Sequence, residues 1–215
     1  MCIRDSVDGH DTPRRLKKGE AISIVFDLDQ IAYRIFKGHK IRLSISNSYW
    51  PLLWPTPDKS EIEIVEGSIE IPVINGSIEN TRNFLPEKTD EPWKTETLRE
   101  ASNSRKITRD IGSDGSILEI IDDFGLVRDL KHDLEIGSIA REWWSIHPDD
   151  PLSAEGKTHW TEERSRGAWK TRTETYAKMN SDAENFYIYA KLEAYENEIL
   201  FFEKEISETI SRDSH

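Results

Sequence analysis

The chain has 215 residues, of which 36% are hydrophobic and 33% are charged, and its formal net charge is -12 at pH 7. This length suits one large all-β domain or two small ones. An acidic surface repels phosphate backbones, which argues against a nucleic-acid partner. No apolar run reaches the length of a membrane-spanning helix, which argues against a membrane partner. The 7 Trp, 6 Tyr and 7 Phe residues favour strands, so we expect an ordered β-rich protein.

The first six residues, MCIRDS, resemble a translated adapter sequence of the kind found at the ends of metagenomic reading frames. The alternative is an ordinary chain start. If they are an artefact, residue 7 lies inside a longer protein. Cys2 is the only cysteine, and without it no thiol remains for a disulfide, a nucleophile or a metal site. No signal-peptide pattern begins the chain, and we expect a cytoplasmic location.

Alternating apolar and polar residues predict short strands in the first third of the chain. The clearest is residues 40–47, where Ile41, Leu43 and Ile45 would share one face and Arg42 would lie on the other. Gly38 permits the turn before it. Further strands are expected at residues 21–28, 32–36, 61–65 and 68–73. Three prolines between residues 48 and 59 predict a loop there, since proline cannot donate to a strand ladder.

A polar connector over residues 76–103 precedes a second β-rich region at residues 104–215. Strands are expected at residues 104–111, 116–122, 134–146, 156–163 and 169–178, with turns at 112–115, 123–125 and 147–151. Residues 182–210 are rich in helix formers, yet their apolar residues recur at a period of two. We interpret them as a long β-hairpin, with a helix as the alternative.

The chain lacks the sequence patterns of the common catalytic sites. There is no G-x-S-x-G nucleophile elbow and no phosphate-binding glycine loop. The six histidines show no metal-ligand spacing, and His39 is interpreted as a structural side chain beside a turn. Asp149, Asp150, Glu162 and Glu163 are adjacent acids of the kind expected by chance in an acidic chain. We therefore predict no catalytic, cofactor-binding or metal-binding residue, and no cofactor.

Four tryptophans stand out as candidate contact residues. Trp50 and Trp54 flank prolines in the apolar loop at residues 48–59. They would form either a platform for a sugar ring or, as we favour, an interface with a neighbouring domain. If residues 134–146 form a strand, Trp143 and Trp144 point to opposite faces of the sheet. One would then lie in the core and the other would point outward.

Several motifs resemble the C-terminal domain of the X-Pro dipeptidyl-peptidase family, which includes cocaine esterase and the CocE/NonD hydrolases. They are GHKIRL at residues 38–43, where the family usually has GHRIRL, with Tyr33 and Phe36 before it. The tail is similar to a long-chain bacterial subfamily through HPDDPLSA at residues 147–154 and LEAYE at residues 192–196. The resemblance implies a jelly-roll sandwich with a galactose-binding-like fold, which in the family packs on an α/β-hydrolase domain that carries a Ser-Asp-His triad.

The resemblance implies that residues 7–75 are the last strands of this jelly roll, incomplete at its N-terminus. The catalytic positions lie outside the chain, so none is carried over. The implied function is that of a non-catalytic C-terminal region of a serine hydrolase acting on acyl esters or Xaa-Pro peptides, and the chain's own status as an enzyme stays uncertain. Its expected partner is the missing α/β-hydrolase domain, and a homo-oligomer is possible. Arg42 is expected to pair with a carboxylate of that domain. The alternative function is a free-standing carbohydrate-binding β-sandwich.

Overall fold

The computed structural model describes residues 17–25, 27–59, 61–74, 76 and 85–212. This part of the chain contains eight strands and no helix, so the predicted all-β fold is confirmed. The strands are β1 (Thr95–Arg99), β2 (Ser102–Arg109), β3 (Ser116–Asp129), β4 (Leu134–His147), β5 (Asp150–Arg166), β6 (Trp169–Ser181), β7 (Asn185–Glu196) and β8 (Ile199–Ser211). Among the described residues, no helix has the length and apolar character needed to cross a membrane.

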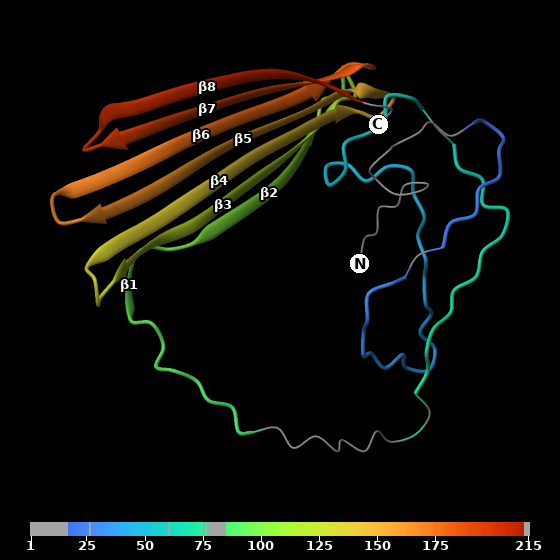
Figure 1. Ribbon diagram of the computed structural model, residues 1–215, viewed down its shortest axis with the longest axis horizontal. Helices are drawn as coiled ribbons and strands as arrows, with labels where there is room; N and C mark the ends of the chain where they lie inside the picture. Colours follow the sequence, from blue (N-terminus) through green and yellow to red (C-terminus); the bar gives the residue numbers. More distant parts are fainter. Residues whose placement is uncertain (1–16, 26, 60, 75, 77–84, 213–215) are drawn as a thin grey trace.

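All eight strands belong to one antiparallel sheet in the order β1-β3-β4-β5-β6-β7-β8, with β2 also paired to β3. From β3 to β8 each strand pairs with the next along the chain, because short turns return the chain directly. Figure 1 shows a strongly twisted and curved sheet. This second antiparallel region matches the one expected after residue 104, and it begins earlier, at Thr95.

The sheet has one apolar face and one polar face. Residues are assigned to a face by two rules: directly paired residues share a face, and neighbours along a strand lie on opposite faces. A row on the apolar face runs Trp144, Gly156, Met179, Ile188 and Glu208 from β4 to β8. A row on the polar face runs Arg141, His159, Tyr176, Lys191 and Glu205. Of the described hydrophobic residues, only Ala140 and Ala154 are fully buried. The described sheet therefore has no closed hydrophobic core of its own.

The C-terminal hairpin was the ambiguous element, and the structure confirms the β interpretation. β7 and β8 pair along their whole length around a turn in which Asn197 and Glu198 have φ of 47° and 65°. The period of two prevails over the helix propensity because Phe186, Ile188 and Leu192 thereby share the apolar face. The turn predicted at residues 112–115 is also present, with the Asp110 carboxylate accepting hydrogen bonds from two backbone amides.

One predicted turn is wrong, and another is shorter than expected. Residues 123–125 lie inside β3, where the register shifts at a bulge. Gly125 has φ of 83°, and a Cβ there would lie 2.7 Å from the Arg99 carbonyl oxygen, so only glycine fits beside β1. The loop expected at residues 147–151 is shorter, since β5 already begins at Asp150. Local turn residues were thus read correctly as irregularities, but not as a bulge within a continuing strand.

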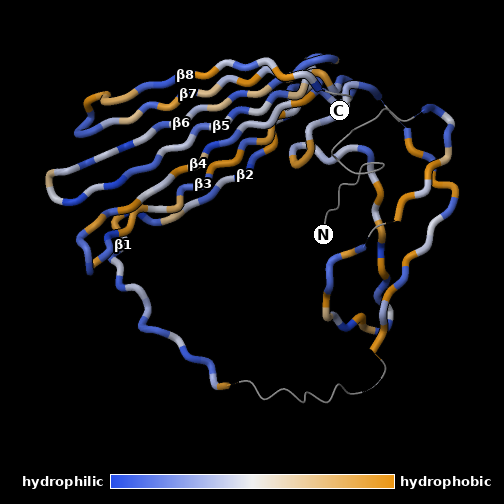
Figure 2. Tube along the Cα trace, viewed as in Figure 1, coloured by the Kyte–Doolittle hydropathy of each residue, from blue (hydrophilic) through white to orange (hydrophobic). Residues whose placement is uncertain are grey.

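The strands expected at residues 21–28, 32–36, 40–47, 61–65 and 68–73 are not formed in the described part of these segments, which has no strand ladder. Ile41, Leu43 and Ile45 are each more than half exposed, so the predicted alternation has no covered face. Figure 2 marks several apolar stretches in this region. Alternation indicates which side chains share a face, but a ladder also needs partner strands, and the register of those partners is not a local property.

Gly156 allows a tryptophan ring to lie across β5. An added Cβ would lie 2.6 Å from Cζ3 of Trp144, the residue paired with Gly156. We expect Gly156→Ala to displace this ring and to lower the free energy of unfolding by about 1–3 kcal/mol, as overpacking does. Gly115→Ala is the matched control, because its nearest atom would be at an ordinary 3.5 Å. Urea unfolding followed by tryptophan fluorescence measures both; equal losses in the two variants would contradict the steric explanation.

Candidate functional site

The proline-rich loop at residues 48–58 docks against one end of the sheet. At this end β4, β6 and β8 finish and β7 begins. Trp50 contacts Trp144 of β4, and Trp54 contacts Phe186 of β7. The loop also contains a cis peptide bond between Trp50 and Pro51. We call these contacts, together with Ser181 and Arg212, the tryptophan junction.

The aromatic rings of the tryptophan junction meet edge to face. The Trp50 and Trp54 centroids are 5.1 Å apart with the ring planes at 81°, and Trp50 meets Trp144 at 5.7 Å and 82°. Such edge-to-face pairs are favourable beyond the area they bury. Because the two loop indoles are perpendicular and half-buried, they do not form one flat platform for a sugar ring. The geometry instead favours the predicted interface, and the neighbouring unit is the sheet of the same chain.

Arg212 links the loop at residues 48–58 to the end of β6 and the start of β7. Only 3% of its surface is exposed. Its guanidinium donates hydrogen bonds to the Pro55 carbonyl at 2.7 Å, to the Asp182 carbonyl at 3.0 Å and to the Ser181 hydroxyl at 2.9 Å. The same hydroxyl accepts a 2.9 Å bond from Nε1 of Trp54. The guanidinium also lies 4.7 Å from the centroid of the Phe186 ring, within range of a cation–π contact.

Burial also affects the electrostatics of Arg212. It lowers the pKa of the guanidinium from its ordinary value, although the carboxylates of Asp182 and Asp58 act in the opposite direction. The cation therefore sits in a poorly solvated place and depends on the oxygens around it. Arg212 was not predicted to have a role, because its partners lie 30, 31 and 157 positions away along the chain.

A second cluster occupies the polar face, centred on the buried Glu174 of β6. Its Oε2 accepts hydrogen bonds from Thr161 at 2.7 Å and contacts Nε2 of His159 at 2.7 Å, while Arg172 donates to Oε1 at 2.5 Å. The His159 ring stacks on Tyr176 with centroids 4.3 Å apart, and Arg172 lies 4.1 Å over the Tyr195 ring. Burial opposes ionisation of Glu174, but the bonds from Thr161, His159 and Arg172 outweigh it, so its pKa lies below the ordinary value.

This Glu174 network resembles a catalytic arrangement only in its residue types. A carboxylate next to a histidine orients a base when a nucleophile and a cleft accompany it. Here the Thr161 hydroxyl donates to Glu174 rather than to His159. No described group of three or more acidic, histidine or cysteine side chains has an arrangement suited to a metal ion. The described contacts assign the network to the interior of the polar face, where it links β5 and β6.

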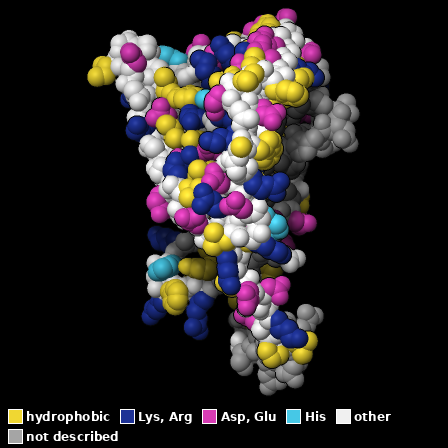
Figure 3. Space-filling model, turned by 90° about the vertical axis from the view of Figure 1, so that its left-hand side faces the viewer, with side chains coloured by type: hydrophobic (Ala, Val, Ile, Leu, Met, Phe, Trp, Pro, Cys, Tyr) yellow, Lys and Arg dark blue, Asp and Glu magenta, His cyan; other side chains and the backbone are white. Residues whose placement is uncertain are grey.

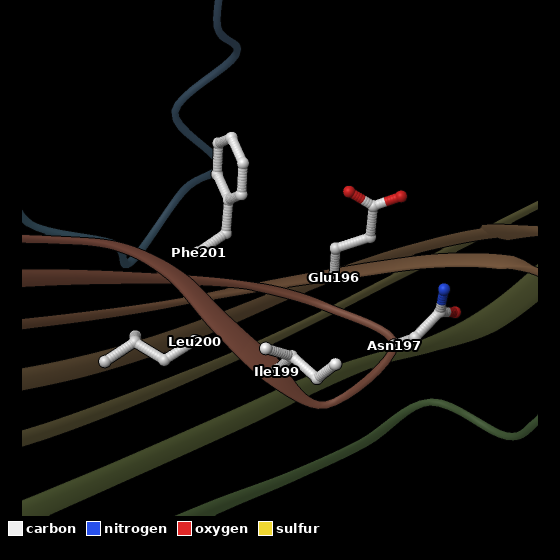
Figure 4. A pocket seen from close by; sticks show the side chains of 5 residues that line it. All are labelled: Glu196, Asn197, Ile199, Leu200 and Phe201. Atoms are coloured by element: carbon white, nitrogen blue, oxygen red, sulfur yellow. The ribbon is translucent and has the colours of Figure 1, made fainter.

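Two hollows in the described surface are open rather than enclosed. One of about 210 Å³ lies at the β7–β8 turn and is lined by Glu196, Asn197, Ile199, Leu200 and Phe201. Figure 4 shows these side chains spreading apart rather than converging on a common point. Another, of about 250 Å³, lies between β6, β7 and β8 and is lined by residues that include Tyr187 and Tyr189. Figure 3 shows acidic and basic side chains intermixed on the visible face, with no field of one sign. Neither hollow encloses a substrate, and the face visible in Figure 3 has no basic field for a polyanion.

The remaining sequence candidates have structural surroundings. His39 lies 6.0 Å from the Phe36 ring, and its amide closes the turn to the Phe36 carbonyl. Glu163 pairs with Arg99 and Glu162 with Arg164, whereas Asp150 binds the Leu152 amide near the start of β5. Trp143 and Trp144 donate to different partners, Glu119 and Glu142, and lie on opposite faces as expected. Both are half-buried, so the division into one core and one outward ring is only partly right.

Arg42 makes no ion pair with any described residue. Its predicted role therefore remains tied to a partner outside this structure.

A comparison with known protein families found a match for the first part of the chain. Residues 4–96 match the family model of the X-Pro dipeptidyl-peptidase C-terminal non-catalytic domain. The match includes the GHKIRL motif and the whole loop of the tryptophan junction, and it ends within β1. No curated protein and no solved structure matches the chain.

Proposed function

We propose that this chain, whose residues 4–96 belong to the X-Pro dipeptidyl-peptidase C-terminal non-catalytic domain family, is the C-terminal region of a serine hydrolase of that kind. The parent enzyme would cleave acyl esters or Xaa-Pro peptides, as the CocE/NonD hydrolases and X-Pro peptidases do. The chain would supply no catalytic group. Its role would be to pack on the α/β-hydrolase domain and help shape the substrate entrance.

The family match carries this proposal, and the tryptophan junction supports extending it to the rest of the chain. Trp50, Trp54 and Pro55 lie inside the matched region, whereas Trp144, Phe186 and Arg212 lie beyond it. The sheet of β1–β8 would therefore be an extension fixed to the family domain. In this organisation residues 7–75 are the last strands of a galactose-binding-like jelly roll, residues 76–103 connect, and residues 104–215 form the extension.

The absence of strand ladders among the described residues between 21 and 73 is what an incomplete sandwich would produce. Each inner strand of a sandwich pairs with neighbours distant in sequence, and the two sheets cover one another. Ile22, Ile64 and Ile71 are between 41% and 60% exposed here, as expected for residues whose covering layer is missing. On this view the upstream strands and the catalytic domain would cover them.

Enzyme assays test the proposal. The purified chain is expected to show no turnover of nitrophenyl esters or Xaa-Pro nitroanilides and no labelling by a fluorophosphonate. An intact homologous gene should encode a G-x-S-x-G domain upstream, and that full-length protein should be labelled. Serine-dependent hydrolysis by the present chain, or intact genes lacking a hydrolase domain, would refute the assignment.

Arg42 provides a test of docking on the catalytic domain. In an intact homologue, Arg42→Ala is expected to lower the free energy of unfolding or of domain docking by more than about 1.5 kcal/mol, as breaking a buried ion pair does. Activity of the triad should persist. Lys40→Ala, on the same face of the segment, is the control. A loss of a few tenths of a kcal/mol, with full activity, would place Arg42 on the solvated surface.

A further inference from the structure

β8 forms one edge of the sheet and is its most exposed strand. It is 13 residues long, every one of its residues is exposed, and among the described strands β7 alone pairs with it. Such a strand extends about 40 Å and presents a row of backbone donors and acceptors to any strand that lies beside it. The opposite edge is divided between β1 and β2, of 5 and 8 residues. Long open edges are usually protected, and β8 has neither a proline nor a bulge beyond its first residues.

The side chains of β8 on the apolar face follow an ordered sequence. They are Phe202, Lys204, Ile206, Glu208 and Ile210, paired with residues of β7 that lie on the same face. Phe202, Ile206 and Ile210 are 47%, 42% and 49% exposed. Lys204 and Glu208 form no ion pair with a described residue. Read from either end, the order is apolar, charged, apolar, charged, apolar, with opposite charges on the two sides of Ile206.

We propose that β8 pairs antiparallel with β8 of a second copy of this chain, about a two-fold axis at Ile206. In this register Lys204 lies opposite Glu208 of the second copy, and Phe202 lies opposite its Ile210. Both contacts occur twice, as an isologous interface requires. On the polar face Glu205 would meet Ser207, and Glu203 would meet Thr209. Opposite charges facing each other across a strand pair are favourable and like charges are not.

Other registers fit the chemistry less well. The register can change only in steps of two residues if each face of the sheet is to continue across the axis, because neighbouring residues point to opposite faces. A step of two residues in register moves the two-fold axis by one residue. An axis at Lys204 places the two lysines opposite each other, and an axis at Glu205 does the same for two glutamates. An axis at Ser207 places Ile206 against Glu208. The axis at Ile206 pairs apolar with apolar and cation with anion.

A head-to-tail contact of β8 with β2 of another copy is the main competing arrangement. β2 carries Arg105, Lys106 and Arg109, but each already pairs within its own copy, with Asp122 at 2.8 Å, Glu119 at 3.4 Å and Asp114 at 2.5 Å respectively. Such a contact would also repeat without closing and give filaments. The isologous β8 pair closes at two copies.

Cysteine cross-linking tests the register directly, in a chain whose single thiol is removed by Cys2→Ser. Ile206→Cys is expected to form a disulfide-linked dimer on mild oxidation, because directly opposed Cα atoms lie about 4.5–5.5 Å apart. Glu208→Cys is the matched control on the same strand face, and its two copies would be about 13 Å apart. Circular dichroism confirms that each variant folds. Equal cross-linking of the two variants would overturn the register.

Charge exchange tests the same contact without a covalent bond. Sedimentation equilibrium of the unmodified chain should give a dimer, and Lys204→Glu should raise the dissociation constant at least tenfold by opposing two glutamates. Adding Glu208→Lys to that variant restores opposite charges and should restore dimerisation. A chain that is monomeric at all concentrations, a failure of the exchange to rescue, or a mass that grows beyond two copies would overturn the proposal. The last outcome would indicate the β8–β2 arrangement.

Discussion

Replacing Arg212 with alanine is expected to lower the free energy of unfolding by about 2–4 kcal/mol, because the change leaves several buried oxygens without a donor. The guanidinium binds the Pro55 and Asp182 carbonyls and the Ser181 hydroxyl, and it contacts the Phe186 ring. Hydrogen bonds to a charged group contribute more than neutral ones. Urea unfolding at neutral pH measures the loss.

Two further variants separate the role of Arg212 from a general effect of removing an arginine. Arg212→Lys keeps the charge but lacks the planar fork of donors, so an intermediate loss of stability is expected. Arg105→Ala removes a half-exposed arginine that binds Asp122 at 2.8 Å, and such surface pairs contribute little to stability because solvent screens them. If Arg212→Ala and Arg105→Ala lower the free energy of unfolding equally, the tryptophan junction does not depend on Arg212.

The junction also predicts which part of the chain loosens. Arg212→Ala removes the hydrogen bond to Pro55, which holds the loop at residues 48–58 against the sheet. Proteolysis is therefore expected to cut this loop faster in the variant while β3 to β7 stay protected, because local opening exposes the loop without unfolding the sheet. Faster cutting within β4 or β5 would instead indicate global unfolding.

Local periodicity predicted the sheet well and the first third of the chain poorly. The strands from β3 to β8 form a meander, so each strand finds its partner in the next segment, and the pattern of one segment nearly determines the pairing. Ile41, Leu43 and Ile45 show an equally clear alternation, yet they form no ladder in the described structure. In a jelly roll the partners of such a strand are distant in sequence, and local pattern does not supply them.

The polar contacts were the least predictable part of the candidate site. The segment with Arg172 and Glu174 was predicted as a strand, and nothing in that prediction indicated that just 8% of Glu174 is exposed. Its partners Thr161 and His159 come from β5, and the sequence separation of 13 and 15 residues hides them. Trp50 and Trp54 were identified as contact residues because apolar side chains between prolines in a loop need a partner. Their partner, the sheet that follows in the same chain, was not predicted.

Glu174→Ala is the second change with a large expected effect. It should lower the free energy of unfolding by about 2–4 kcal/mol. The reason is that the donors of Thr161, His159 and Arg172 lose their acceptor in the interior of the polar face. The range is below that for a fully buried ion pair, since His159 and Arg172 keep 24% and 28% of their side chains exposed. Glu162→Ala, whose partner Arg164 is 40% exposed, is the control and should cost less than about 1 kcal/mol.

The pH dependence gives this prediction a second, independent measurement. The pKa of Glu174 in the folded chain lies below its ordinary value of 4.5, so the folded state favours the ionised form and the unfolded state binds the proton more readily. The stability contributed by the carboxylate is therefore fully present above about pH 4.5, and it is lost as the pH falls through the lower, folded-state pKa. Glu174→Gln imitates the protonated group. Its deficit relative to the unmodified chain should be full at pH 7 and should shrink below pH 4.5, whereas a deficit that stays constant over this range would mean that packing, and not the charge of Glu174, stabilises the polar face.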